Sequence, residues 1–404
     1  MPKILNNPSM DFRDSPQEAA FRAEARAFLQ EHAPARLPDY ADESVDQDEV
    51  LALAKAWQRT RFKYGWGSIT WPTECGGRGL GPIEQIIWNQ ELTRIGFGES
   101  HFFQGVGLAG PTIIAHGTEQ QKERFLEPIL RADETWCQLF SEPGAGSDLA
   151  NLATRAERTG EEWTITGQKT WCSGGHDADW GILLARSDPT LPKHKGISYF
   201  LIDMHEPGIE VRPLRQLDGT THFNEVFLNQ VRVPDANRLG AVGEGWRVAM
   251  TTLMNERMAI GGLERLVSFD ALLEHARANR HRVDDVARDE LGRLYCWVKA
   301  LELLNARVIT KLGRGEIPDA ESSVMKVAIA RMLTKAGDIG LRLCGPDAML
   351  RSGAWQNQFL TAPTLHIGGG TDEIQKNVCA ERVLGLPREP RGDRDIPFDQ
   401  LPRS

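Results

Sequence analysis

The spacing of apolar residues changes twice along this 404-residue chain, and this limits its fold more than any other feature. In the first third, residues such as Phe21, Ala25 and Phe28 recur three or four positions apart, as on one face of a helix. Between about 136 and 228 the apolar runs are short and are separated by Pro and Gly, which indicates β-strands. From about Gly243 the helical spacing returns and persists. The pattern therefore predicts an α+β fold in the order helical, β, helical.

The same pattern predicts the domain limits. We expect an N-terminal α-helical domain over residues 1–130, a middle β-barrel-like domain over 131–238, a C-terminal four-helix bundle over 239–390 and a tail over 391–404. The bundle is predicted from helical segments at about 244–280, 284–312, 319–344 and 371–384. Within the β-domain, Trp163–Cys172 is predicted to alternate around a turn. The tail beyond Pro387 is charged and rich in proline, so it is expected to be only loosely ordered.

Composition excludes several classes of function. A net charge of −9 argues against a general nucleic-acid or anionic-membrane binder. The six cysteines are scattered without a Cys-x-x-Cys pair, which argues against structural zinc and disulfides and fits a reducing cytosol. No run approaches the roughly 20 apolar residues of a membrane span, and no signal peptide is visible. We therefore expect a cytoplasmic protein without a bound metal or a membrane span.

Three segments combine glycines with hydroxyl side chains. They read FSEPGAGSD at 140–148, GQKTWCSGG at 167–175 and IGGGTDEIQKN at 367–377. Glycine-rich backbone can place N–H groups against a polar or anionic ligand without steric obstruction. Thr371 is also a good N-cap for the last helix. Any one segment could be a plain tight turn, but three together predict a site for a large ligand with flat and polar parts.

These segments carry a family resemblance. The stretches WCQLFSEPGAGSDLA, GQKTWCSGG, FNEVFLNQVRVP and GGGTDEIQKNVCAERVLGLPRE are similar to signatures of the acyl-CoA dehydrogenase family, and the resemblance covers nearly the whole chain. It implies FAD bound between the β-domain and the final bundle. It also implies oxidation of an acyl-CoA to the trans-2-enoyl-CoA in lipid catabolism, with the α-proton taken by a carboxylate and the β-hydride by flavin N5.

The resemblance also assigns roles to individual residues. The cofactor-binding positions it implies are Gln138, Phe140, Ser141, Trp171, Ser173, Gly370, Thr371 and Glu373. The substrate-binding positions it implies are Ser147, Arg257 and Gly369. It further implies an electron-transferring flavoprotein as electron acceptor and a tetramer, homomeric or heteromeric.

The catalytic base departs from the commonest pattern of the family. Many members carry a Glu where this chain has Gly369, whereas others place the base on the first long helix of the C-terminal domain, where this chain has Glu256. The residue types support Glu256, because it shares a helix face with apolar residues, and desolvation raises the pKa of a buried acid. That face is formed by Trp246, Ala249, Leu253, Glu256, Ile260 and Leu263. A Glu that pairs with an Arg from another helix is the structural alternative, and Glu264 is a weaker rival for the base.

Two other motifs of the family are altered here. The region of its Arg-x-x-Phe-Gly element, residues 277–285, lacks Phe-Gly, so Arg280 or Arg282 would have to substitute. Its Gln-x-x-Gly-Gly element reads LRLCG at 341–345. These departures, together with Gly369, favour one alternative: a non-catalytic or FAD-sharing subunit of a mixed tetramer. An oxygen-using acyl-CoA oxidase or flavin monooxygenase on the same fold, and an enzyme that eliminates a group, are two further alternatives.

Overall fold

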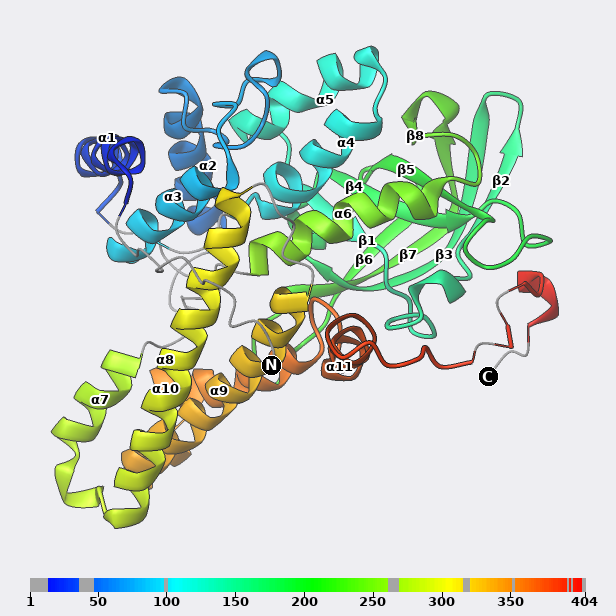
Figure 1. The fold of residues 1–404 in the computed structure, drawn as a ribbon. Coiled ribbons are helices and arrows are strands. Elements are labelled where there is room, and N and C mark those ends of the chain that lie inside the picture. The colour runs from blue at the N-terminus through cyan, green and yellow to red at the C-terminus, as the bar shows by residue number, and fades with distance from the viewer. Residues whose placement is uncertain are drawn as a thin grey trace, which may run out of the picture.

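The computed structural model describes residues 14–35, 47–97, 101–260, 269–314, 320–350, 353–390, 392–393 and 395–401. Within them a helical N-terminal part is followed by one sheet and then by a second helical part (Figure 1). The predicted α+β class and the order helical, β, helical are therefore confirmed. No helix among these residues is long and apolar enough to cross a membrane.

The N-terminal part is held by capped amphipathic helices. Its helices are α1 (Pro16–His32), α2 (Gln47–Lys63), α3 (Pro82–Arg94), α4 (Gly110–His116) and α5 (Glu119–Arg131). Ser15 precedes Pro16 and lies three residues before Glu18, a spacing that predicts a capping box, and it caps α1 by accepting a hydrogen bond from the Glu18 amide. Thr118, three residues before Gln121, caps α5 in the same way. The apolar face of α1 is buried, with Phe28 stacked on Trp66 at 5.1 Å between ring centroids.

The middle part is an eight-stranded sheet in the order β6-β7-β3-β2-β4-β5-β8, with β1 parallel to β4. Its strands are β1 (Trp136–Leu139), β2 (Arg155–Thr159), β3 (Glu162–Ser173), β4 (Trp180–Arg186), β5 (Ile197–Asp203), β6 (Ile209–Pro213), β7 (Phe223–Pro234) and β8 (Arg238–Leu239). One apolar core joins a face of this sheet to α5 and to the first helix of the C-terminal part.

The turn predicted within Trp163–Cys172 is wrong, because these residues lie in one continuous strand, β3. Its register against β7 shifts twice, between Ile165 and Gly167 and again between Lys169 and Cys172. A Cβ on Gly167 would lie 2.3 Å from the Thr154 hydroxyl, so glycine here permits close approach of the segment just before β2. The break in alternation that suggested a turn therefore marks β-bulges.

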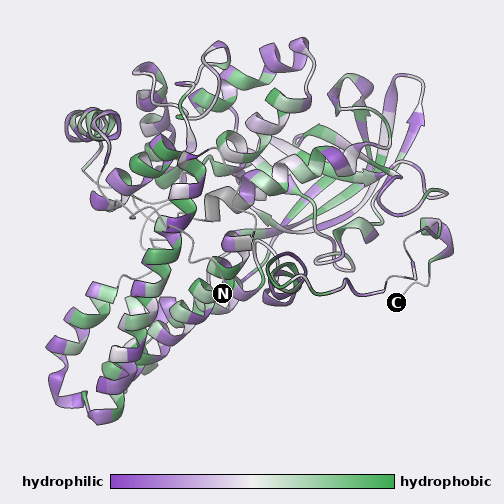
Figure 2. Ribbon diagram, in the orientation of Figure 1, coloured by the Kyte–Doolittle hydropathy of each residue, from purple (hydrophilic) through white to green (hydrophobic). Residues whose placement is uncertain are grey.

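The C-terminal part contains α6 (Gly245–Ile260), α7 (Phe269–Ala278), α8 (Asp285–Gly313), α9 (Ala320–Cys344), α10 (Ala354–Thr361) and α11 (Asp372–Val378). Helix α6 packs on α4 and β5, whereas α7 to α10 extend away from the sheet (Figure 1). Green apolar residues alternate with purple polar ones along α8 and α9, as amphipathic helices require (Figure 2). The sequence did not predict α10, and of the helix predicted over 244–280 the residues 261–268 lie outside the described part.

The tail is not loosely ordered throughout, which corrects the expectation from composition. Pro397 forms a β-bridge with Pro192, and the Phe398 amide donates to the Leu191 carbonyl at 3.0 Å. The described end of the chain is therefore attached to the loop between β4 and β5.

Candidate active site

The first glycine segment forms a tight turn after β1. Glu142 and Ala145 exchange two backbone hydrogen bonds of 3.0 Å each, so the chain reverses between them. Phe140 is 4% exposed and packs in the shared core, whereas Gly144, Gly146 and Ser147 are exposed. A Cβ on either glycine would meet nothing within 4 Å. The turn therefore presents small residues and open backbone on a rigid base.

A buried ion pair fixes this turn to β3. Lys169 is fully buried, and its Nζ donates to the Glu142 carboxylate at 2.8 Å and to the Phe140 carbonyl at 3.1 Å. Glu142 also accepts from the amides of Ala153 and Thr154 at 2.7 and 2.9 Å. Burial alone would raise the pKa of Glu142, but Lys169 and these amides outweigh it and lower the pKa. Burial lowers the pKa of Lys169 more than Glu142 raises it.

Trp171 stands out in the second glycine segment. It lies in the second bulge of β3 with φ of 60°, a left-handed conformation that is costly for a bulky residue. Its side chain is nevertheless 61% exposed and touches Phe223 edge to face at 5.9 Å. Bulges can redirect a side chain out of a sheet. The bulge therefore holds a flat aromatic side chain on the outside of the strand, at the cost of backbone strain at Trp171.

Two other predicted cofactor-binding residues lie in strands β3 and β1. Ser173 is partly buried at the end of β3, and Gln138 is partly buried in β1. Cys172 is buried, which raises its pKa to about 12, so its thiol stays protonated.

A line of contacts joins Phe140 to helix α6. The Phe140 ring meets Tyr199 edge to face at 5.8 Å, and the Tyr199 hydroxyl lies 3.1 Å from that of Thr252. Thr252 also hydrogen bonds Thr112 at 2.9 Å. Glu256 lies four residues after Thr252, and so on the same side of the helix about 6 Å further along its axis.

Of the two acids that the sequence offers as the base, Glu256 lies within the described residues and Glu264 does not. Glu256 is partly buried rather than enclosed in the apolar face. On that face Ala249 is buried and Leu253 packs against the shared core. The side chains of Arg257 and Ile260, and the whole of residues 261–268 with Leu263 and Glu264, lie outside the described residues.

The third glycine segment is held by α9. Gly369 and Gly370 have φ of 65° and 91°, and Thr371 caps α11 by accepting from the Ile374 amide at 3.2 Å. Asp372 is 6% exposed and receives hydrogen bonds from two side chains: Lys326 Nζ lies 3.2 Å from one carboxylate oxygen and His366 Nδ1 lies 2.7 Å from the other.

His366 and Arg282 have structural partners. The second ring nitrogen of His366 lies 2.9 Å from the Thr334 hydroxyl, so this side chain links the segment after α10 to α9. Arg282 donates to the carbonyls of Leu343 and Cys344 at 3.1 and 2.7 Å. It therefore binds the end of α9.

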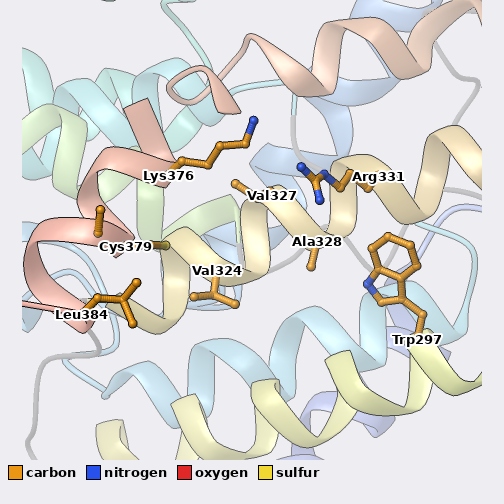
Figure 3. A pocket seen from close by; sticks show the side chains of 9 residues that line it. Trp297, Val324, Val327, Ala328, Arg331, Lys376, Cys379 and Leu384 are labelled. Atoms are coloured by element: carbon orange, nitrogen blue, oxygen red, sulfur yellow. The ribbon is translucent and has the colours of Figure 1, made fainter. Parts of the chain in front are cut away.

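A cavity of about 300 Å³ lies elsewhere, between α8, α9 and the segment around α11. Figure 3 shows Arg331 and Lys376 beside a mainly apolar lining. The lining contains Trp297, Val324, Val327, Ala328, Arg331, Lys376, Cys379, Ala380 and Leu384. None of these residues is among the predicted site residues. Within the described ranges, no three His, Cys, Asp or Glu side chains are grouped as a metal site.

The chain matches three family models in succession. These are the N-terminal domain of acyl-CoA dehydrogenases at residues 15–133, the middle domain at 137–231 and the C-terminal domain at 243–384. Together they span the glycine turn, Trp171 and the segment before α11.

Curated relatives and solved structures agree with these matches. Acyl-CoA dehydrogenase IpdE1 of Mycobacterium tuberculosis is 37% identical over 353 residues, covering 86% of this chain and 91% of that protein. Acyl-CoA dehydrogenase FadE34 of the same organism is 44% identical over 325 residues; the match covers 79% of this chain but only 44% of that longer protein. The solved Tcur3481-Tcur3483 steroid ACAD superposes with a TM-score of 0.82 at 29% identity, covering 94% of this chain and all of that one.

A second solved structure, the ChsE4-ChsE5 complex from Mycobacterium tuberculosis, superposes with a TM-score of 0.77 at 28% identity, covering 94% of this chain and all of that one. Three consecutive domain matches and an alignment with IpdE1 over most of its length are consistent with one another. The chain therefore belongs to the acyl-CoA dehydrogenase family of oxidoreductases.

Proposed function

We propose that the protein is an FAD-dependent acyl-CoA dehydrogenase that converts an acyl-CoA to the trans-2-enoyl-CoA. The observation that carries this proposal is Trp171, an exposed aromatic side chain held in a strained backbone conformation beside the glycine turn. Such strain persists where function requires it. A flat aromatic surface next to open backbone fits a ligand with a planar ring system and polar arms.

The residues present fit FAD. Phe140, Ser141, Gln138, Trp171 and Ser173 would contact its ring system, at the end of β1 and in the second bulge of β3. The turn at Gly370, Thr371 and Glu373 would hold its polar arm, since left-handed glycines let backbone approach a ligand closely. When bound, FAD supplies the acceptor for a hydride from the β-carbon.

Glu256 would remove the α-proton. Helix α6 carries it on the side fixed by Thr252 and Tyr199, so the acid is placed relative to Phe140 by packed elements rather than by a loop. Gly369, without a side chain, would leave room for the Glu256 carboxylate, and its N–H would donate to the thioester carbonyl as negative charge develops. Ser147 and Arg257 would contact the CoA portion.

We further propose a bulky acyl group that contains rings. One similar solved structure is described as a steroid ACAD, which supports this. The family resemblance also links a base on this helix, the place assigned to Glu256, to branched or bulky acyl groups. A straight-chain substrate is the alternative that a substrate panel would reveal.

A mixed assembly is the second candidate arrangement. Both solved structures cited above carry the names of two proteins, and the one from Mycobacterium tuberculosis is described as a complex. In this chain, large apolar side chains are exposed on α8, on α9 and after α11, which fits burial against another subunit. They include Leu303, Val324, Val383, Leu384 and Leu386.

One experiment tests the function directly. The purified protein is examined for the flavin absorption band and titrated without oxygen with straight-chain, branched and steroid acyl-CoAs. We expect bleaching with the ring-containing substrate. Glu256→Gln should abolish bleaching while flavin stays bound, whereas Glu302→Gln, an exposed acid on α8, should behave as wild type.

Other outcomes would contradict the proposal in different ways. Unchanged bleaching in Glu256→Gln would remove the assigned base. Colourless protein that gains flavin only with a second protein would indicate a mixed complex. Rapid reoxidation by oxygen with peroxide release, rather than by an electron-transferring flavoprotein, would indicate an oxidase.

A further inference from the structure

The end of the chain is attached to the loop that follows β4. We call residues 392, 393 and 395–401 the C-terminal strap. Besides the contacts of Pro397 and Phe398 with that loop, the Asp399 amide donates to the Pro189 carbonyl at 3.0 Å. Three consecutive strap residues thus pair with three residues of the β4–β5 loop, although about 200 residues separate them in the sequence.

An ion-pair cluster joins the strap to the glycine turn. Lys193 lies in the β4–β5 loop, and its Nζ is 2.8 Å from an oxygen of Asp148 and 2.6 Å from an oxygen of Asp393. The Lys193 side chain is only 6% exposed. Burial opposes its charge, but hydrogen bonds to the two carboxylates outweigh burial and raise its pKa. Asp148 directly follows Ser147, so the strap reaches the residue beside the proposed substrate contact.

A buried guanidinium forms a second connection. Arg186 is 3% exposed and donates to the carbonyls of Ala150 and Leu152 at 2.6 and 3.0 Å. It also donates to the Lys193 carbonyl, and the Phe398 ring covers it with 3.8 Å between Cζ and the ring centroid. Burial lowers the pKa of Arg186 to about 10. The Phe398 ring therefore covers the Arg186 guanidinium, and Arg186 in turn holds residues 150–152, which follow the glycine turn.

We propose that Asp393 and Phe398 are positioning residues for the substrate. Through Lys193 and Arg186 they hold residues 148–152, and thereby keep Ser147 where the CoA portion binds. The identity of the ligand rests on the proposed function, whereas the coupling between strap and turn does not. Both residues act through other side chains, so they affect binding and leave the chemical step unchanged.

The test compares three variants of the full-length, flavin-loaded protein. Asp393→Asn removes one charge of the cluster, and Phe398→Ala uncovers Arg186. Asp395→Asn makes the same substitution at an exposed residue of the strap and serves as control. We expect Asp393→Asn and Phe398→Ala to raise KM for the acyl-CoA and Kd for free coenzyme A by about three- to tenfold, from the loss of a partly buried ion pair or cation–π contact. The kcat and the flavin content should stay within about twofold of wild type.

Hydrogen exchange separates this inference from the proposed function. Amides of residues 143–152 should exchange faster in Asp393→Asn and Phe398→Ala than in wild type or Asp395→Asn, with no need for a substrate. Equal exchange in all four proteins would overturn the coupling, and so would a fall in kcat without a rise in KM. If exchange responds but no acyl-CoA binds to the wild type, the coupling stands and the assignment of its ligand as coenzyme A fails.

Discussion

Removing the ammonium of Lys169 should loosen the glycine turn and destabilise the protein. Lys169→Met keeps most of the side-chain volume but leaves Glu142, whose side chain is only 8% exposed, without its cation. Losing one partner of a buried pair costs about 3–5 kcal/mol. We expect the lower end, about 3 kcal/mol, because the amides of Ala153 and Thr154 still donate to the carboxylate.

A thermal melt with a matched control measures this loss. At an unfolding entropy of about 2.1 cal/mol/K per residue, 1 kcal/mol shifts the midpoint of a 404-residue chain by about 1 °C, so the midpoint of Lys169→Met should fall by about 3–4 °C. Lys299→Met removes an exposed lysine on α8, whose ion pair with Glu302 is worth at most about 1 kcal/mol, and should shift the midpoint by no more than about 1 °C. Flavin retention should fall with Lys169→Met, because the Phe140 carbonyl loses its donor.

A double-mutant cycle gives the result that would refute the reasoning. If the cost comes from an unpaired buried charge, then Glu142→Gln combined with Lys169→Met should cost less than the sum of the two single changes. Additive costs, within about 0.5 kcal/mol, would show that the two residues do not act as a pair. A midpoint shift no larger than that of Lys299→Met would show the same.

Two further perturbations test separate parts of the structure. Trp171→Gly should leave the melting midpoint unchanged or raised, because glycine relieves the left-handed strain of about 1 kcal/mol or more. The variant should nevertheless lose flavin. A lower midpoint with flavin retained would contradict this prediction. Glu91, bound by Arg22, Arg26 and Arg94, has its pKa lowered to about 2, chiefly by the hydrogen bond from Arg26. The ion pairs of Glu91 stabilise the folded protein by about 1–2 kcal/mol, less than the pKa shift alone implies, because Arg26 and Arg94 are solvated. This stabilisation is present above about pH 4.5 and is lost as the pH falls towards 2. Glu91→Gln should flatten acid unfolding over that window; an unchanged profile would exclude the role.

Much of the fold could be predicted because local rules decide it. Ser15, Thr118 and Thr371 cap their helices as their spacing predicts, and the change from helical to short apolar runs marks the sheet. The candidate site was reached through a family resemblance instead, since no local rule relates Glu256 to Phe140. Phe140 is linked to helix α6, which carries Glu256, through Tyr199 and Thr252, which lie far apart in sequence. The domain limits remain predictions.

What the sequence did not predict depends on long-range electrostatics. A lysine in a strand is ordinarily assigned to the solvent face, and only the three-dimensional fold shows that Lys169 points to Glu142. The strap was missed for a similar reason. Its charge and proline content suggest disorder, but two of its side chains contact buried cations of the middle domain. Asp393 pairs with Lys193, and the Phe398 ring covers Arg186.

Lys169 and Trp171 are two residues apart, and their contrasting environments have a common cause. In a regular strand residues two apart point to the same face, so both side chains would enter the core or both would reach solvent. The second bulge of β3 lies between Lys169 and Cys172 and breaks this rule, so that Lys169 is fully buried and Trp171 is 61% exposed. The strain at Trp171 is therefore tolerated because Lys169, fixed by Glu142 and the Phe140 carbonyl, prevents the strand from returning to regular register. The ion pair therefore stabilises the exposed position of Trp171 as well as the glycine turn. Replacing Lys169 should accordingly weaken flavin binding through a displaced Trp171 side chain.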